Sequence, residues 1–340
     1  MSDTVTSYRV ATIADGHEHL AQDLEDALAA ASKQRTRAPR ELLVRATLSS
    51  LVSSAAVEWL VIGLTWAALA ACWLWAAPAV LVVVAVAAVV VIAGRLHALG
   101  VILHDAVHMP LRGKPPLARV LEVVAGFPIA TTLNAMRYHH LRHHRDSGMA
   151  TDPYKKPVLD GRPLLYAAYV LKGAFLLPFW FARGPVGVFA LAVPALRNFY
   201  GRVFLQDRSG EELRAAQEVV DCARAEVAYS CFVAAVVIAV VVWPAPLLLG
   251  YVVPATLTGI VGARRVLREH NYELTFDRRM DTLFQTTNDH GLSLAGRLLL
   301  APRNIGYHVV HHLHPQVTLC ALPALRNWYR QEHPPYPAPR

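Results

Sequence analysis

Two pairs of long apolar runs, each joined by a short turn, constrain the fold of this chain more than any other feature. The first pair covers residues 51–75 and 77–101, and Glu58 is the only charged residue between positions 51 and 94. The second pair covers residues 227–243 and 247–263 and contains no charge. A helix rises about 1.5 Å per residue, so the first pair can cross a hydrocarbon core of about 30 Å, and the second is at the short end of that range. We expect four transmembrane helices in two hairpins.

The overall composition agrees with a membrane protein. The chain has 340 residues, of which 54% are hydrophobic and 17% charged, and its mean hydropathy is +0.32. These values are typical of an all-α integral membrane protein. The net charge of +8 is not accompanied by an aromatic and basic nucleic-acid motif, so no nucleic-acid partner is expected.

The distribution of basic residues predicts the orientation. The turns at residues 76–78 and 244–246 carry no Lys or Arg. Because basic residues are retained on the cytoplasmic side, both turns are expected on the opposite side. The N- and C-termini and a helical cap between and after the hairpins are then cytoplasmic.

Two further apolar stretches, residues 117–133 and 164–199, are interrupted by charged residues and prolines. We expect both to form helices that lie in the membrane interface. A single crossing after residue 144 would put the histidine clusters described below on opposite faces. Two short spans within residues 164–199 would keep the clusters on one face, and remain the alternative.

The ends of the chain are polar. Residues 1–45 are predicted to be a cytoplasmic segment with one short amphipathic helix over residues 20–28, residues 46–330 form the membrane domain, and the proline-rich residues 331–340 are expected to be a disordered tail. The four cysteines, at positions 72, 222, 231 and 320, have no CxxC spacing. A disulfide framework or thiolate metal site is therefore not expected.

Eight of the 16 histidines fall into three clusters. Helical spacing places residues i, i+3 and i+4 on one face, so each cluster can direct its imidazoles into a small volume. A solvated basic patch would need neither the doublets nor the spacing, so we interpret the clusters as a metal site. The clustered residues are His104, His108, His140, His143, His144, His308, His311 and His312.

Eight imidazoles exceed the number that one ion can bind, so two ions are predicted. Metal-bound histidines need hydrogen-bond partners for their second nitrogens. Asp105, Asp152 and Glu269, together with Asp146 and Asp289, lie close enough in sequence to supply them. Each of these carboxylates could equally belong to a surface ion pair.

The order of the motifs HDAVH, HHLRHH and YHVVHHLHP, with membrane hairpins between them, resembles the membrane fatty acid desaturase superfamily over roughly residues 94–328. The resemblance implies a non-haem di-iron centre, bound mainly by histidine, that uses dioxygen to attack an unactivated C–H bond. It adds His270, in Arg268-Glu269-His270, as a ninth ligand. It leaves Asn304 and Asn288 as candidates for completing the coordination, and it requires His314 to point away.

The function implied is desaturation of the acyl chain of a lipid or thioester. A hydroxylase or ketolase acting on a lipid or carotenoid on the same scaffold is the alternative, because Asp152-Pro153 also resembles carotenoid ketolases. A metal transporter is a remote alternative, since it would place ligands near the middle of its spans, whereas these clusters lie at or beyond the predicted span ends.

Electrons are expected from a separate donor, of ferredoxin or rubredoxin type with its reductase, because the chain has no electron-carrier motif of its own. An acidic donor could dock on basic residues of the predicted cytoplasmic face. Positive-inside bias and attraction to anionic lipid explain the same residues without a donor. They are Arg112, Lys114, Arg119, Lys155, Lys156, Arg264, Arg265, Arg278 and Arg279.

Overall fold

The structure, a computed structural model, describes residues 38–111, 115–275 and 279–339. All regular elements in these ranges are helical, with isolated bridges at Arg45–Val317 and His270–Thr287. The prediction of an all-α fold is confirmed for this part of the chain. The predicted helix at residues 20–28 and the basic residues Arg112, Lys114 and Arg278 lie outside it.

The first predicted hairpin is formed by α2 (Leu48–Trp75) and α3 (Pro78–Val107). The hydroxyl of Thr47 accepts a hydrogen bond from the Ser50 amide at 3.2 Å and caps α2. Pro78 begins α3, where its missing N–H costs no hydrogen bond. Because α3 continues beyond the predicted end at residue 101, it carries His104 and His108 out of the apolar region.

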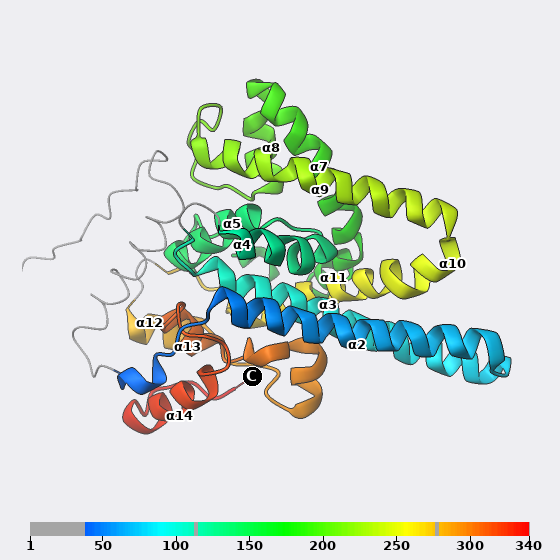
Figure 1. The fold of residues 1–340 in the computed structure, drawn as a ribbon. Coiled ribbons are helices and arrows are strands. Elements are labelled where there is room, and N and C mark those ends of the chain that lie inside the picture. Colours follow the sequence, from blue (N-terminus) through cyan, green and yellow to red (C-terminus); the bar gives the residue numbers. More distant parts are fainter. Residues whose placement is uncertain (1–37, 112–114, 276–278, 340) are drawn as a thin grey trace, which may run out of the picture.

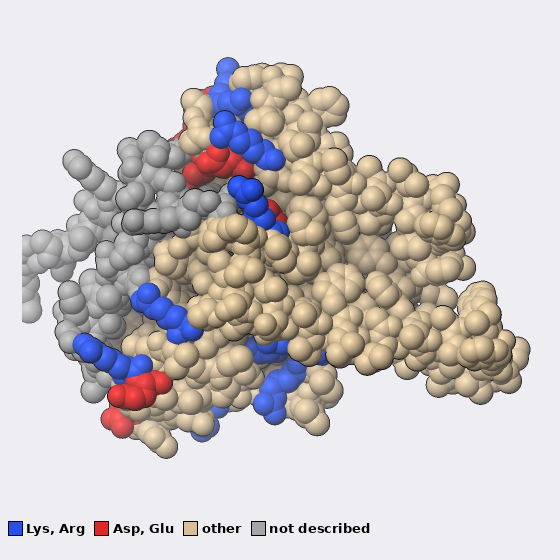
Figure 2. All heavy atoms as spheres, viewed as in Figure 1, with Lys and Arg blue, Asp and Glu red and all other residues tan. Residues whose placement is uncertain are grey.

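The second hairpin consists of α9 (Gln217–Val242) and the helical run Pro244–Glu269. This run contains α10 (Pro244–Leu247), the π-helical turn η7 (Leu248–Val252) and α11 (Val253–Glu269). Both hairpin turns lie at one end of the molecule and α12–α14 at the other (Figure 1). The face drawn in Figure 2 shows no charged side chain around the hairpin turns, which is the surface expected inside a bilayer.

Residues 163–192, predicted to form interfacial helices, add one candidate to the four predicted spans. Five helical runs, rather than four, are long and apolar enough to cross a membrane by length and composition, and the fifth is Pro163–Ala192. It contains α6 (Pro163–Leu171), η5 (Lys172–Phe175) and α7 (Leu176–Ala192). The chain forms one long helical run here, without the turn that the alternative of two short spans would need, and Pro185 lies inside it.

Close packing explains why this run stays helical despite its breakers. A Cβ on Gly173 would lie 2.6 Å from the Gly259 carbonyl oxygen of α11, and a Cβ on Gly187 would lie 2.6 Å from Cγ of Glu226 on α9. Glycine lets the helices approach this closely, so tertiary contacts outweigh the weak helix propensity of the sequence.

The stretch at residues 117–133 forms a bent pair of helices. It comprises α4 (Pro116–Leu121), η2 (Glu122–Gly126) and η3 (Phe127–Ile129), followed by α5 (Leu133–Asp146) at 79°. Ala130 takes a left-handed conformation, with φ of 61°, at the bend. The hydroxyl of Thr132 then caps α5 by accepting a hydrogen bond from the Ala135 amide. If this pair is counted as one span, the number of candidates rises to six.

The remaining elements are short and gather mainly around the histidine-bearing ends of the hairpins. They are η1 (Arg40–Leu42), η4 (Pro157–Leu159), η6 (Pro194–Leu196), α8 (Arg197–Phe204), α12 (Met280–Thr286), η8 (Gly296–Leu300), η9 (Pro302–Asn304), α13 (His308–Leu313) and α14 (Leu322–Glu332). Near the C-terminus, Tyr336 is buried and its hydroxyl donates to Asp289 at 2.8 Å. The structure thus packs part of the tail that the sequence predicts to be disordered.

A buried charge connects this region to the first hairpin. Glu58 of α2 accepts hydrogen bonds from Arg95 of α3 and from Arg303, each at 2.9 Å. Arg303 lies shortly before α13 in the sequence. The only acidic residue of the first predicted span therefore fixes the segment that leads into the last histidine cluster.

Candidate metal centre

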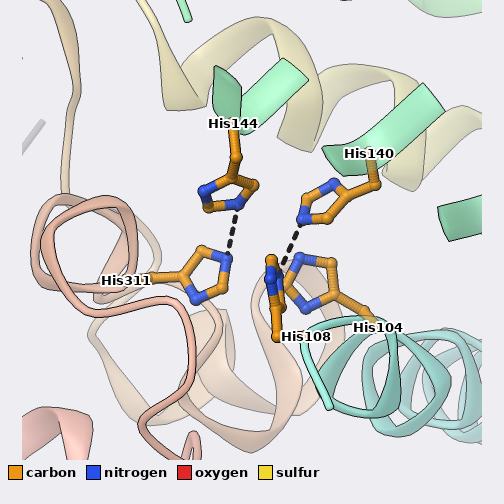
Figure 3. Close-up of side chains that lie close together, drawn as sticks. All are labelled: His104, His108, His140, His144 and His311. Atoms are coloured by element: carbon orange, nitrogen blue, oxygen red, sulfur yellow. Dashed lines mark hydrogen bonds between the residues drawn. The ribbon is translucent and has the colours of Figure 1, made fainter. Parts of the chain in front are cut away.

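Five histidines form the first of two compact groups, here called group one. His104 and His108 come from the end of α3, His140 and His144 from α5, and His311 from α13, and their ligand atoms lie within 4.8 Å of one another (Figure 3). The Nε2 atoms of His108 and His140 are 3.1 Å apart, and those of His144 and His311 are 3.0 Å apart.

The other four histidines form group two. It contains His143 of α5, His270 at the end of α11, and His308 and His312 of α13. The Nε2 atom of His270 lies 3.1 Å from that of His143 and 3.2 Å from that of His308. His308 and His312 are likewise 3.1 Å apart. All nine predicted histidines are thus divided between two neighbouring groups.

The donor set fits metal ions. A neutral imidazole has one N–H and one lone pair, so a row of Nε2 atoms that all face one another cannot be satisfied by hydrogen bonds whenever Nδ1 carries the proton. The converging lone pairs would then be satisfied by cations between them. Each group also offers at least the three or four nitrogen ligands that a protein metal site needs.

Asp152 orients one of these imidazoles. Its Oδ1 atom lies 2.8 Å from Nδ1 of His143, and its Oδ2 atom accepts a hydrogen bond from the Gly148 amide at 2.9 Å. A proton held on Nδ1 by this carboxylate leaves the Nε2 lone pair of His143 directed into group two. Burial alone would raise the pKa of Asp152, but His143 beside it lowers that pKa to about 2.

Burial keeps histidines of both groups in their neutral form. Burial lowers the pKa of His311 to about 3, and burial together with the neighbouring His143 lowers the pKa of His270 to about 3. Burial also holds the pKa of His144 and that of His308 well below 6.5. Neutral imidazole is the form that binds metal, so these side chains are poised for ligation at neutral pH.

The other predicted supporting residues have different partners. Glu269 lies 3.1 Å from Arg265 and 3.7 Å from Nδ1 of His308, so it is close to group two. Asp105 accepts a hydrogen bond from Thr318, and Asn288 donates one to the Arg268 carbonyl.

Asn304 accepts a hydrogen bond from the Tyr307 amide through its backbone carbonyl. Within the described residues, these hydrogen bonds of Asp105, Asn288 and Asn304 involve none of the nine histidines.

Two neighbours of the histidines were not found from the sequence. The Tyr154 ring stacks on His143 with a centroid distance of 4.3 Å, and its hydroxyl lies 2.7 Å from Nδ1 of His139. Thr287 forms a bridge with His270 and places its hydroxyl 3.5 Å from Nδ1 of that residue. Neither residue follows a periodic pattern, so only the tertiary structure reveals it.

His314 behaves as predicted. Its Nε2 atom lies 2.7 Å from the Tyr329 hydroxyl, and it belongs to neither group. His308, His311 and His312 are directed toward the other histidines, which is the register that the sequence predicts for the last cluster.

A cavity of about 240 Å³ adjoins both groups. His104 and His140 of group one and His308 of group two form part of its wall. Much of the remaining wall is apolar and comes from α3, α7 and α11, including Leu96, Val101, Leu176, Leu177, Trp180 and Ala255. An apolar molecule in this cavity would lie next to the histidines of both groups.

Fold and site together define a membrane protein with a buried, histidine-rich centre suited to metal ions. The chain matches the fatty acid desaturase family over residues 79–340, which is more than half of its length. It belongs to that family, as the histidine motifs had indicated, and is accordingly an oxidoreductase; the family implies iron as the metal of the histidine centre. A search of curated proteins gives no match.

Proposed function

We propose that the protein desaturates the acyl chain of a lipid or thioester, using dioxygen and electrons from a separate donor. The observation that carries this proposal is the pair of adjacent histidine groups bordering one apolar cavity. Two groups suit two iron ions, and one cavity suits a chain that passes both. Hydroxylation or ketone formation on the same scaffold is the alternative outcome.

Two iron ions, when bound, supply the oxidising power of dioxygen toward an unactivated C–H bond. The chain contributes position and environment. Asp152 fixes the orientation of His143, and the largely apolar wall of the cavity would hold the substrate chain beside the histidines. In desaturation the substrate loses two hydrogen atoms, and dioxygen becomes water with electrons from the donor.

The test is to measure iron and products together. Purified protein should contain about two irons per chain, as two histidine groups require, and should consume dioxygen with a reductant and its donor system. Lipid profiles of cells with and without the chain should differ by new double bonds. The appearance of new alcohols or ketones would instead identify the protein as a hydroxylase or ketolase. Uptake of zinc into vesicles, without bound iron, would support a metal transporter.

Single His143→Ala and His311→Ala variants provide the matched pair for the two groups. Each should abolish turnover and reduce bound iron. His314→Ala is the control, because His314 contacts Tyr329 and not the histidine groups. Full activity in either ligand variant would contradict the site.

We further propose four spans, with the histidine centre and both termini in the cytoplasm. A contact between a residue before and a residue after the fifth candidate span, Pro163–Ala192, supports this topology. Arg142 of α5 forms an ion pair with Glu218 of α9 at 2.7 Å, so the chain before and after Pro163–Ala192 returns to the same place. A single crossing by that run is incompatible with this contact, whereas a helix lying in the interface is not.

The donor proposed is an acidic ferredoxin or rubredoxin. Among the predicted basic residues, Arg119 and Arg279 are exposed, and Lys156 and Arg264 are partly exposed. Lys155 is buried and donates to the Glu273 carbonyl, and Arg265 borders the cavity. The docking surface is therefore smaller than the sequence suggests. Reduction by an acidic donor should weaken as salt rises.

A further inference from the structure

The short helix α13 needs support from other segments of the chain. It covers only His308–Leu313 but carries three of the nine histidines. His308 and His312 belong to group two and His311 to group one, so a shift of this helix would displace nitrogen ligands of both groups. A helix this short is not stable in water on its own. Contacts from outside α13 must therefore fix its position.

Asp289 provides one of these contacts. Its side chain is fully buried, and Oδ1 accepts a hydrogen bond from the Val309 amide at 3.1 Å. This amide is one of the N–H groups in the first turn of α13 that have no partner within the helix. A hydrogen bond from such an amide to a carboxylate is charge-assisted and among the stronger ones in proteins. Asp289 therefore caps α13 from a separate segment of the chain.

The segment that contains Asp289 also contacts a ligand of group two from another helix. Thr287 forms an isolated bridge with His270, which lies at the end of α11. The His290 amide donates a hydrogen bond to the Gly306 carbonyl at 2.9 Å, just before α13. Residues 287–290 thus connect His270 with the start of α13, and they help to set the distance between the two.

The second oxygen of Asp289 extends this support to α14 and to the segment that follows it. Oδ2 accepts hydrogen bonds from Nε of Arg326 at 2.7 Å and from the Tyr336 hydroxyl at 2.8 Å. Both donor side chains are buried, each with 7% of its surface exposed. The guanidinium balances the charge of the buried carboxylate. Because two donors hold one oxygen, the other oxygen stays directed at the Val309 amide.

We propose that Asp289 is a positioning residue of the metal centre and that Tyr336 holds it in place, so that the affinity of group two for metal depends on a tyrosine outside the three histidine clusters. Asp289 acts through the backbone of α13, whereas Asp152 acts through an imidazole. The inference rests on the proposed function only in that it takes the histidine groups to hold metal ions.

The test is binding of iron(II) alone, without dioxygen, to the metal-free full chain in detergent, measured by competition with a graded chelator. Tyr336→Phe removes the hydroxyl and keeps the ring, so it leaves the packing of the side chain in place. Its iron affinity should be about three- to ten-fold below that of the wild type, as expected for the loss of one hydrogen bond. Asp289→Asn should lower the affinity by about ten- to a hundred-fold, the effect typical of losing a supporting partner.

Tyr200→Phe is the matched control. The Tyr200 hydroxyl donates to Oε1 of Glu226 at 3.1 Å, and Arg183 donates to the same oxygen at 2.8 Å. This is the same chemistry as around Asp289, but Glu226 belongs to neither histidine group. Both tyrosine variants should lower the melting temperature of the metal-free protein, and only Tyr336→Phe should lower the iron affinity. Iron is titrated well below the melting temperature, where a loss of global stability alone leaves the affinity of the folded protein unchanged.

An iron affinity of Tyr336→Phe equal to that of the wild type overturns the proposal, because the tyrosine then contributes to stability alone. If Asp289→Asn fails to fold, Tyr336→Phe still decides the question. Reduced affinity in Tyr336→Phe, together with a wild type that consumes no dioxygen, overturns the proposed function and leaves the role of Asp289 in place. Desaturation by the wild type, together with unchanged affinity in Tyr336→Phe, overturns only that role.

Discussion

At the scale of single residues, the carboxylate of Asp152 has the clearest supporting role. It holds Nδ1 of His143 and the amide of Gly148 at the same time, so it fixes both the imidazole and the loop that follows α5. We predict that Asp152→Asn lowers the iron affinity of group two by about ten- to a hundred-fold, the effect typical of losing such a partner.

The measurement is iron retained per chain during dialysis against a graded chelator. Asp160→Asn is the control, because Asp160 is exposed in the same connection between α5 and α6. Equal iron retention in the two variants would remove Asp152 from the centre.

The buried histidines also make stability depend on pH. The pKa of His270 and that of His311 lie near 3 in the folded protein, against 6.5 in the unfolded chain. The unfolded chain therefore binds more protons below pH 6.5. The iron-free protein should be most stable above that pH and lose up to about 1.4 kcal/mol per pH unit for each such histidine as the pH falls toward 3.

Thermal unfolding of the iron-free protein at pH 8, 7, 6 and 5 checks this expectation. The melting temperature should be level at the upper two values and decrease at the lower two. The double variant His270→Asn with His311→Asn should show a shallower decrease. Equal slopes in the two proteins would contradict the assignment of the pH dependence to these side chains.

The histidine motifs were predictable because local helical spacing already fixes which nitrogens share a face. Their division into groups was not, because His143 and His144 are adjacent in sequence yet belong to different groups. Adjacent positions on a helix differ in direction by roughly 100°, so the doublet lets α5 contribute to both groups. Tyr154 and Thr287 depend on loop and bridge contacts that no periodicity encodes.

At the scale of elements, the hairpins were predictable from their long runs with almost no charge, whereas the long helix Pro163–Ala192 was not. Its lysine and prolines suggest breaks, but the glycines that allow it to pack against α9 and α11 become visible only in the structure. Glu58 is similar. Its presence in a span was plain, but its partners Arg95 and Arg303 lie far along the chain.

The close approach of Gly173 and Gly259 allows a test of the packing between the run Pro163–Ala192 and α11. A Cβ on Gly259 would lie 2.4 Å from the Gly173 carbonyl oxygen, a distance that forces the helices apart. We predict that Gly259→Ala destabilises the protein by about 1–3 kcal/mol, as overpacking usually does. Thermal unfolding in detergent measures the change.

Gly63→Ala is the control, since nothing lies within 4 Å of a Cβ at that position of α2. It should be neutral or slightly stabilising, because alanine favours a helix over glycine by up to about 1 kcal/mol. Equal melting temperatures for Gly259→Ala and Gly63→Ala would mean that the two helices are not in contact as described.

At the scale of the whole molecule, the histidine centre requires chain segments from both hairpins to end on one side. His104 and His270 are delivered from α3 and α11, and α5 and α13 contribute the rest. The ion pair between Arg142 and Glu218 makes the segment between α5 and α9 start and end at the same place. The position of the histidine centre therefore depends on the membrane topology, and the topology can be tested on protein without bound metal.

Cysteine labelling with a membrane-impermeant maleimide provides the test. In a background lacking Cys72, Cys222 and Cys231, the exposed Cys320 reports on the cap. Ala215→Cys reports on the exposed loop after Pro163–Ala192, and Ala77→Cys on the turn of the first hairpin. We predict that Cys320 and Ala215→Cys react only in inside-out vesicles, whereas Ala77→Cys reacts only in intact cells.

Each pattern of labelling corresponds to one topology. If Pro163–Ala192 crossed the membrane once, Ala215→Cys would react from the side opposite Cys320, and the pairing of Arg142 with Glu218 would be impossible in the membrane. If all three sites reacted from one side, the first hairpin would not span the bilayer. Reaction of Cys320 and Ala215→Cys from the outside would reverse the orientation while keeping the two hairpins, and would move the metal centre to the non-cytoplasmic face. Only the predicted pattern leaves the centre accessible to a cytoplasmic electron donor.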